Sequence, residues 1–214
     1  MSNPILEAYL QQAAAYQMTE ERMARIIETA KNRQPGLMVI MEDVHNHHNL
    51  AAIARSCDAF GIQKIAFTLE DETLFDPTQS GEITSASASK WLDYRIFEQG
   101  THHALTTLKS EGWHIMATWI SREAPSIYEV DFTLHDQLAL LVGNEHAGLS
   151  KMAIEMADSY VWIPMMGMIQ SFNVSVATAI SLFEITRQRL QRPNQFQNDD
   201  AQIQSLIEDF IQRA

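Results

Sequence analysis

The segment Ile163-Pro-Met-Met-Gly-Met-Ile-Gln-Ser171-Phe-Asn173-Val-Ser-Val-Ala177 decides the fold class of this chain. It begins as a strand end, which Pro164 and Gly167 break because proline has no N–H and glycine tolerates positive φ. Asn173 then stands at an N-cap position ahead of an apolar run over residues 174–185. A strand, a loop and a capped helix in succession leave backbone groups free, and this arrangement predicts a ligand pocket.

Strand-like apolar runs recur along the chain, at residues 37–41, 64–69, 114–120, 137–142 and 160–163. Helical patterns lie between most of them. This alternation predicts an α/β fold with a mainly parallel sheet flanked by helices. Two helices are expected before the first strand, over residues 4–16 and 19–33, and Thr19 opens the second. A polar linker over residues 191–197 precedes a last helix from residues 198–200 to 211.

The chain of 214 residues with 46% hydrophobic content is long enough for one main domain with appendages. We expect a helical extension over residues 1–35, a main domain over 36–190 and a C-terminal linker and helix over 191–214. The single cysteine, Cys57, excludes an intramolecular disulfide and favours a reducing compartment. No apolar run approaches the roughly 18 residues of a membrane span. A cytoplasmic protein with no membrane partner is therefore predicted.

The net charge argues against a partner with a phosphate backbone, because 15 Lys and Arg stand against 27 Asp and Glu, giving −12. The basic residues are unevenly distributed, however. One group lies in the N-terminal segment and another at the end of the helix after residue 173; they include Arg22, Arg25, Arg187 and Arg189. Such strips are compatible with RNA binding, and ordinary solvated helix faces are the alternative.

Two upstream segments complete a recognisable set with the 163–177 segment. They are residues 42–61, EDVHNHHNLAAIARSCDAFG, and residues 141–150, LVGNEHAGLS. In this order and spacing the three resemble the motifs of the SPOUT methyltransferases, in the TrmH (SpoU) branch. That branch transfers a methyl group from S-adenosylmethionine to a ribose 2'-hydroxyl of RNA. The resemblance covers residues 36–190 and implies that fold and activity, a C-terminal deep trefoil knot and a homodimer.

Arg55 is the leading catalytic candidate, by the resemblance and by its surroundings. If Asn49 caps a helix that runs to residue 59, the helical neighbours of Arg55 are Ala51, Ala52 and Ala59, which leave room for a large substrate. A guanidinium keeps its proton in proteins, so we interpret Arg55 as a donor that stabilises developing alkoxide. A general-base role is the alternative.

The resemblance assigns further site residues. The catalytic site is implied to include Asn49, Glu145, Ser171 and Asn173 beside Arg55. Helix capping is compatible with the site role of Asn49 and is the alternative for Asn173, and a solvated loop glutamate is the alternative for Glu145. The S-adenosylmethionine contacts are implied to be Thr118, Ile163 and Phe172, together with backbone groups near Gly143 and Met168. Phe172 stands where many relatives have leucine.

Two other kinds of site are weighed and set aside. Several histidines, at positions 45, 47, 48, 102 and 103, invite a metal site, but the single cysteine and the lack of a carboxylate at ligand spacing weaken it, and we predict no metal. A dinucleotide oxidoreductase is disfavoured because no G-x-G-x-x-G motif follows a strand.

The helix over residues 174–190 is apolar on nearly every side in its first turns, so we expect it to be buried on one side by the sheet and on the other by a second subunit. The terminal helices resemble those of the enzymes that methylate a guanosine of the tRNA D-loop. In that reading Arg22, Arg25, Arg187 and Arg189 contact the RNA. Ribosomal RNA, the tRNA anticodon loop and a catalytically silent RNA-binding protein are the alternatives.

Overall fold

The computed structural model describes residues 4–11, 13–69 and 89–214. The chain divides into two compact units, Met1–Gln34 with Gln197–Ala214, and Pro35–Phe196. The N-terminal helices and the C-terminal helix, which are far apart in the sequence, therefore belong to one unit. Every helix in the described part of the chain is too short or too polar to be a membrane span.

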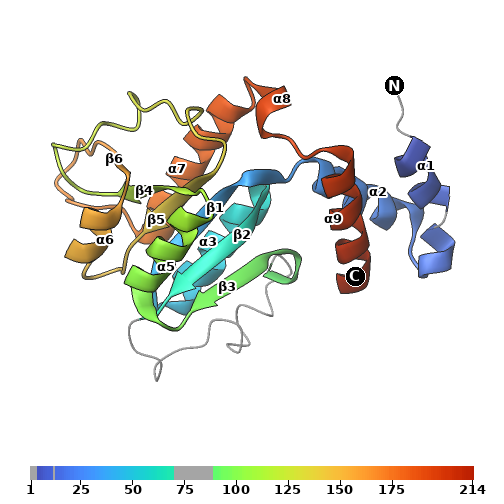
Figure 1. The fold of residues 1–214 in the computed structure, drawn as a ribbon, viewed down its shortest axis with the longest axis horizontal. Coiled ribbons are helices and arrows are strands. Elements are labelled where there is room, and N and C mark those ends of the chain that lie inside the picture. Colours follow the sequence, from blue (N-terminus) through green and yellow to red (C-terminus); the bar gives the residue numbers. More distant parts are fainter. Residues whose placement is uncertain (1–3, 12, 70–88) are drawn as a thin grey trace. The chain divides into compact units, whose positions relative to one another are not determined.

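The larger unit is built on a six-stranded sheet in the order β3-β2-β1-β5-β4-β6 (Figure 1). The strands are β1 Gln34–Glu42, β2 Ile62–Thr68, β3 Asp93–Phe97, β4 His114–Thr118, β5 Leu138–Val142 and β6 Ser159–Val161. The pairs β1/β5, β2/β3, β4/β5 and β4/β6 are parallel. Parallel strands end at the same edge of a sheet, so the loops after β4, β5 and β6 converge, and the predicted α/β class is confirmed.

Helices cover the sheet on both faces. They are α3 His47–Ala59, α5 Gly100–Ser110, α6 Lys151–Met156 and α7 Val174–Arg189. The short helix α8 Pro193–Phe196 follows α7, and a 3-10 turn η2 lies at Ser89–Trp91. One core cluster joins the sheet to α3 and α7 through residues such as Leu50 and Leu182. The other joins it to α5 and α6 through residues such as Leu105 and Ala153. Burial on both faces explains the continuous apolar strands β1 and β5.

The strands predicted from apolar runs are all present, with ends shifted by a few residues, but β3 was not predicted. This strand lies at the edge of the sheet, next to β2. Of its five residues only Phe97 is buried, and Arg95 is exposed. Its sequence, Asp-Tyr-Arg-Ile-Phe, therefore lacks the apolar run of an interior strand.

Helix α7 begins after Asn173, as predicted, because the Asn173 side chain accepts a hydrogen bond from the Ser175 N–H. In the single chain the helix is buried on one side only. The buried side carries Thr178, Ser181, Leu182, Ile185 and Arg189. The predicted polar linker after it is also partly wrong, because residues 193–196 form α8 and Phe196 is buried.

The smaller unit contains α1 Pro4–Gln11, the 3-10 turn η1 Ala13–Tyr16, α2 Glu20–Lys31 and α9 Asp200–Arg213. Thr19 caps α2, as predicted, by accepting from the Arg22 N–H. Asp199 and Gln202 form a reciprocal capping box that starts α9. The Arg33 side chain is buried in this unit, with its guanidinium carbon 5.5 Å from the centre of the Phe210 ring.

Candidate active site

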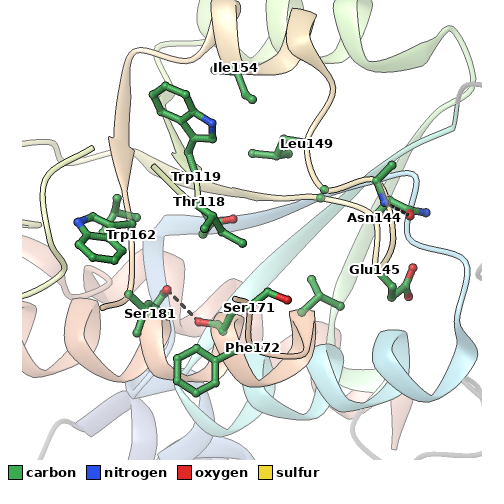
Figure 2. A pocket seen from close by; sticks show the side chains of 18 of the residues that line it. Thr118, Trp119, Asn144, Glu145, Leu149, Ile154, Trp162, Ser171, Phe172 and Ser181 are labelled. Carbon is green, nitrogen blue, oxygen red and sulfur yellow. Dashed lines mark hydrogen bonds between the residues drawn. The ribbon is translucent and has the colours of Figure 1, made fainter. Parts of the chain in front are cut away.

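A cavity of about 360 Å³ lies where the carboxyl ends of β4, β5 and β6 meet the start of α7. Figure 2 shows Asn144 and Glu145 on one side of this cavity and Trp119 and Trp162 on the other. Its lining comes from the ends of three strands, from the loop before α7 and from α7 itself. This is the edge at which open α/β sheets bind their ligands.

The loop after β5 is held in a compact shape by its own backbone. Asn144 and Gly148 exchange two N–H to carbonyl hydrogen bonds of 3.0 Å each. A Cβ atom on Gly143 would lie 2.4 Å from the Gly148 carbonyl carbon, so only glycine fits there. Gly148 has φ of +69°, a conformation that favours glycine. The two glycines therefore let residues 143–149 fold against the cavity.

Three predicted catalytic side chains form one hydrogen-bonded chain. Glu145 Oε1 accepts from Asn49 Nδ2 at 3.0 Å and from the Asn46 N–H at 3.1 Å. Asn49 Oδ1 accepts from Asn173 Nδ2 at 3.0 Å. Burial raises the pKa of the Glu145 carboxyl, but hydrogen bonds from Asn49 and from backbone N–H groups outweigh it, and the net pKa is lowered. The three segments that carry the motifs therefore meet through a charged carboxylate.

The prediction that Asn49 caps α3 is wrong. Asn46 is the N-cap, because its Oδ1 accepts from the N–H groups of His48 and Asn49 at 2.9 and 3.3 Å. Asn49 lies in the first turn of the helix and is buried. Its amide is free for Glu145 and Asn173 because Asn46 takes the capping role.

Arg55 is exposed on α3, and its neighbours Ala52 and Ala59 are exposed as well. In the described part of the chain, no hydrogen bond or ion pair engages its guanidinium. Ser171 is exposed and lines the cavity. Arg55 does not line the cavity within this single chain.

Four of the five predicted cofactor contacts line the cavity: Thr118, Gly143, Ile163 and Phe172. Thr118 Oγ1 donates to the Leu141 carbonyl oxygen at 3.1 Å, which joins the ends of β4 and β5. Met168 does not line the cavity, and its side chain is fully exposed. The contact expected near Met168 is one through the backbone, and it stays a prediction.

Comparison with known proteins shows the family to which this chain belongs. The pattern of the SpoU rRNA Methylase family matches residues 36–183. The chain is 42% identical over 176 residues to the tRNA (guanosine(18)-2'-O)-methyltransferase of Thermus thermophilus, a match that covers 81% of this chain and 86% of that protein. The chain belongs to the SpoU methyltransferase family. The predicted family is confirmed, and the protein is a SpoU-family methyltransferase.

Solved SpoU structures agree with this fold. The crystal structure of the Aquifex aeolicus TrmH/SpoU tRNA modifying enzyme superposes with a TM-score of 0.77 at 34% identity, covering 90% of this chain and 96% of that chain. An AdoMet-bound rRNA methyltransferase from Sinorhizobium meliloti superposes with a TM-score of 0.63 at 25% identity, covering 75% of this chain and 59% of that chain. SpoU-family methyltransferases therefore bind S-adenosylmethionine (AdoMet).

The four arginines predicted to contact RNA differ in their surroundings. Arg25 is exposed, and Arg22 is exposed with its Nη2 donating to the Ala214 carbonyl oxygen at 2.6 Å. Arg187 is exposed and forms two hydrogen bonds of 2.8 and 2.7 Å with the Glu184 carboxylate.

The prediction that Arg189 contacts RNA is wrong. Its side chain is buried, with 2% of the residue exposed. Arg189 donates to the carbonyl oxygens of Gly36 and His135 at 3.1 and 3.2 Å, and its guanidinium carbon lies 4.3 Å from the centre of the Phe196 ring. Burial lowers the pKa of Arg189 to about 10, although Asp136 partly opposes this. Arg189 is a structural residue in this family member.

Several cavity residues were not predicted from the sequence. Trp119 and Trp162 both line the cavity, and each directly follows a strand end, β4 or β6. Asn144 and Ser181 line it as well. The position of a residue just after a parallel strand was the available signal for the two tryptophans and Asn144. Ser181 sits among apolar residues in mid-helix, and no pattern marked it.

Proposed function

We propose that the protein transfers a methyl group from AdoMet to the ribose 2'-hydroxyl of a guanosine in tRNA. The observation that carries the proposal is the chain from Glu145 through Asn49 to Asn173, which ties the three motif segments together beside the cavity. The relative in Thermus thermophilus is named for guanosine 18 of tRNA, which supports that nucleotide as the target.

The residues around the cavity fit AdoMet. Its volume of about 360 Å³ lies in the range of ligand pockets, about 300–1,000 Å³. Ile163 and Phe172 supply apolar wall, and Asn144 and Thr118 supply polar groups. When bound, AdoMet supplies an electrophilic methyl group on a sulfonium. Residues 143–149 also line the cavity, so their backbone N–H and carbonyl groups are available to bind the polar groups of AdoMet.

Arg55 has the properties needed by a substrate-side cation. It is exposed, it is free of partners within the described residues, and small side chains lie beside it on α3. A guanidinium that keeps its proton orients the RNA phosphate or hydroxyl and stabilises negative charge on the ribose oxygen. Glu145 and Asn173 hold Asn49, which lies on the same helix as Arg55.

The working form is a homodimer paired through α7. Its exposed side carries Val176, Phe183 and Leu190, spaced by seven residues, with exposed fractions of 45%, 57% and 69%. Residues seven apart share one helix face, so these side chains form an apolar stripe. A second copy of the chain is the partner that covers it. Pairing also accounts for the position of Arg55, which does not line the cavity of its own chain. In the dimer, each subunit would bring its Arg55 to the cavity of the other.

RNA contact falls to the remaining predicted arginines. Arg22, Arg25 and Arg187 are exposed, whereas Arg189 is withdrawn from the set by its burial. Counterion release predicts that tRNA affinity falls with salt, with a slope set by the number of phosphates neutralised.

The test is methyl transfer from labelled AdoMet to purified tRNA and ribosomal RNA, followed by mapping of the modified ribose. A tRNA with 2'-deoxyguanosine at position 18 is the matched control, since it lacks only the acceptor oxygen. Methylation of the natural tRNA and not of the control supports the proposal. Methylation of ribosomal RNA or of the anticodon loop would refute the proposed nucleotide. AdoMet binding without transfer to any RNA would identify a silent RNA-binding protein.

A further inference from the structure

Glu42, the last residue of β1, is a buried carboxylate that the site described above does not use. Only 2% of the residue is exposed. Its Oε2 accepts from the Ser150 N–H at 2.8 Å and its Oε1 accepts from Ser150 Oγ at 2.7 Å. Within the described residues, no lysine or arginine pairs with it. A buried carboxylate is costly unless it is hydrogen-bonded, so the contact with Ser150 is its main support.

Ser150 connects this carboxylate to the cavity. It is the N-cap of α6, and its Oγ accepts from the Ala153 N–H at 3.0 Å while donating to Glu42. It directly follows residues 143–149, all of which line the cavity. Glu42 therefore fixes the point at which the cavity loop ends.

The start of the same loop is held by Asp43, the residue that follows Glu42. Asn144 Nδ2 donates to the Asp43 carbonyl oxygen at 2.7 Å. Asn144 Oδ1 accepts from the N–H groups of His146 and Ala147, which shapes the loop itself. Residues 42 and 43 thus hold the two ends of the loop, one through a buried carboxylate and one through a backbone oxygen.

The middle of the loop is held through Glu145, which Asn46 and Asn49 contact. Segment 42–49 is therefore hydrogen-bonded to the start, the middle and the end of segment 144–150. Its last three residues form the first turn of α3, the helix that carries Arg55. We propose that Glu42 is a positioning residue that holds the AdoMet loop at residues 143–150 against the segment leading to the substrate-side helix. This inference rests on the proposed function, because it assigns the loop to AdoMet.

The variant Glu42→Gln keeps the size of the side chain and replaces one acceptor oxygen by a donor. Both the N–H and the Oγ of Ser150 donate to the carboxylate, and the new amide nitrogen cannot accept from either of them. At least one charge-assisted hydrogen bond is therefore lost. We expect amide hydrogen exchange over residues 143–150 to become faster. AdoMet affinity should fall about tenfold, as expected for one lost charged hydrogen bond. The kcat at saturating AdoMet should change by less than about threefold, since Glu42 touches no reacting group.

Two matched variants separate positioning from general stability. Glu155→Gln removes an exposed carboxylate from the same helix α6; in the wild type the Glu155 Oε1 lies 3.6 Å from Lys151 Nζ. It should leave loop exchange and AdoMet affinity at wild-type values. Ser150→Thr retains the hydroxyl and should behave as wild type, whereas Ser150→Ala removes it and should resemble Glu42→Gln. Binding is read by tryptophan fluorescence, because Trp119 and Trp162 line the cavity.

The outcomes distinguish this inference from the proposed function. Faster exchange limited to residues 143–150, with a raised KM for AdoMet and a preserved kcat, supports the positioning role. Wild-type exchange and affinity in both Glu42→Gln and Ser150→Ala would overturn it. If Glu42→Gln fails to fold, Ser150→Ala decides by the same two measurements. A wild-type protein that binds no AdoMet refutes the proposed function, and the exchange experiment still decides whether Glu42 anchors the loop.

Discussion

Replacing Arg189 by alanine should destabilise the fold and leave RNA binding unchanged, although the sequence suggested the opposite. Arg189 donates to two carbonyl oxygens, those of Gly36 and His135, and lies over the Phe196 ring. Its removal leaves the carbonyl groups without these donors. It also opens a cavity, because the residue is only 2% exposed.

The magnitude follows from opposing contributions. Hydrogen bonds to a charged group contribute about 1.5–3 kcal/mol each, and a desolvated cation–π contact about 2 kcal/mol. Against them stands the cost of burying the charge. Burial is the main cause that lowers the pKa of Arg189 from its usual value to about 10, which corresponds to roughly 3 kcal/mol. The difference favours the arginine, and we expect Arg189→Ala to lower the free energy of unfolding by roughly 2–4 kcal/mol.

The assay is urea unfolding at one fixed protein concentration, since an oligomer's stability depends on concentration. Arg187→Ala is the control, because Arg187 is exposed and pairs only with Glu184 among the described residues. It should leave the free energy of unfolding close to the wild-type value, because an exposed ion pair contributes little to stability.

The tRNA affinity is then measured against salt concentration, under conditions in which each variant is folded. Arg187→Ala should reduce the slope of log affinity against log salt by about one if Arg187 contacts a phosphate. Arg189→Ala should leave the slope unchanged. An Arg189→Ala protein of wild-type stability with a reduced slope would refute the structural role.

Three further predictions concern catalysis, assembly and pH. Arg55→Ala should lower the rate of methyl transfer by at least about 100-fold with near-normal AdoMet affinity; retained activity would contradict its role. Phe183→Asp should give a monomer or an insoluble chain without activity, and sedimentation of a fully active monomer would contradict the α7 interface. The pKa of His114 is lowered by burial and by His135, whose ring centre lies 3.6 Å from that of His114, although Asp158 opposes this shift. The unfolded chain then binds more protons, so stability should fall as pH drops below about 6.5 and His135→Gln should weaken this dependence in urea titrations.

The sequence predicted the interior of the sheet well and its edge poorly. Strands β1 and β5 lie side by side with both faces covered, so their apolar runs are continuous. Edge strand β3 mixes polar and apolar residues, only one of its five residues is buried, and it was missed. The deep trefoil knot stays a prediction from the resemblance.

The errors at the candidate site have one physical origin. Asn46 and Asn49 are both good capping residues, and nothing local decides which of them caps α3. The choice is made by Glu145, about a hundred residues later, which bonds the Asn49 amide. Arg189 was misplaced for the same reason, since an arginine at a helix end is usually exposed. Its burial depends on carbonyl groups near residues 36 and 135, which the sequence around it does not reveal.

The contacts of the individual basic side chains show how many cations of this chain, whose net charge is −12, are free to bind RNA. Most lysines and arginines are held by carboxylates, backbone oxygens or aromatic rings, as in the pair between Arg95 and Glu111. Among the described residues, the basic side chains without such a contact are Arg25, Lys31, Arg55 and Arg122. An RNA with many phosphates therefore meets few cations that are free to bind it, and one of them belongs to the first motif. Weak overall attraction with a cation at the catalytic helix favours an enzyme that recognises RNA locally and releases it readily.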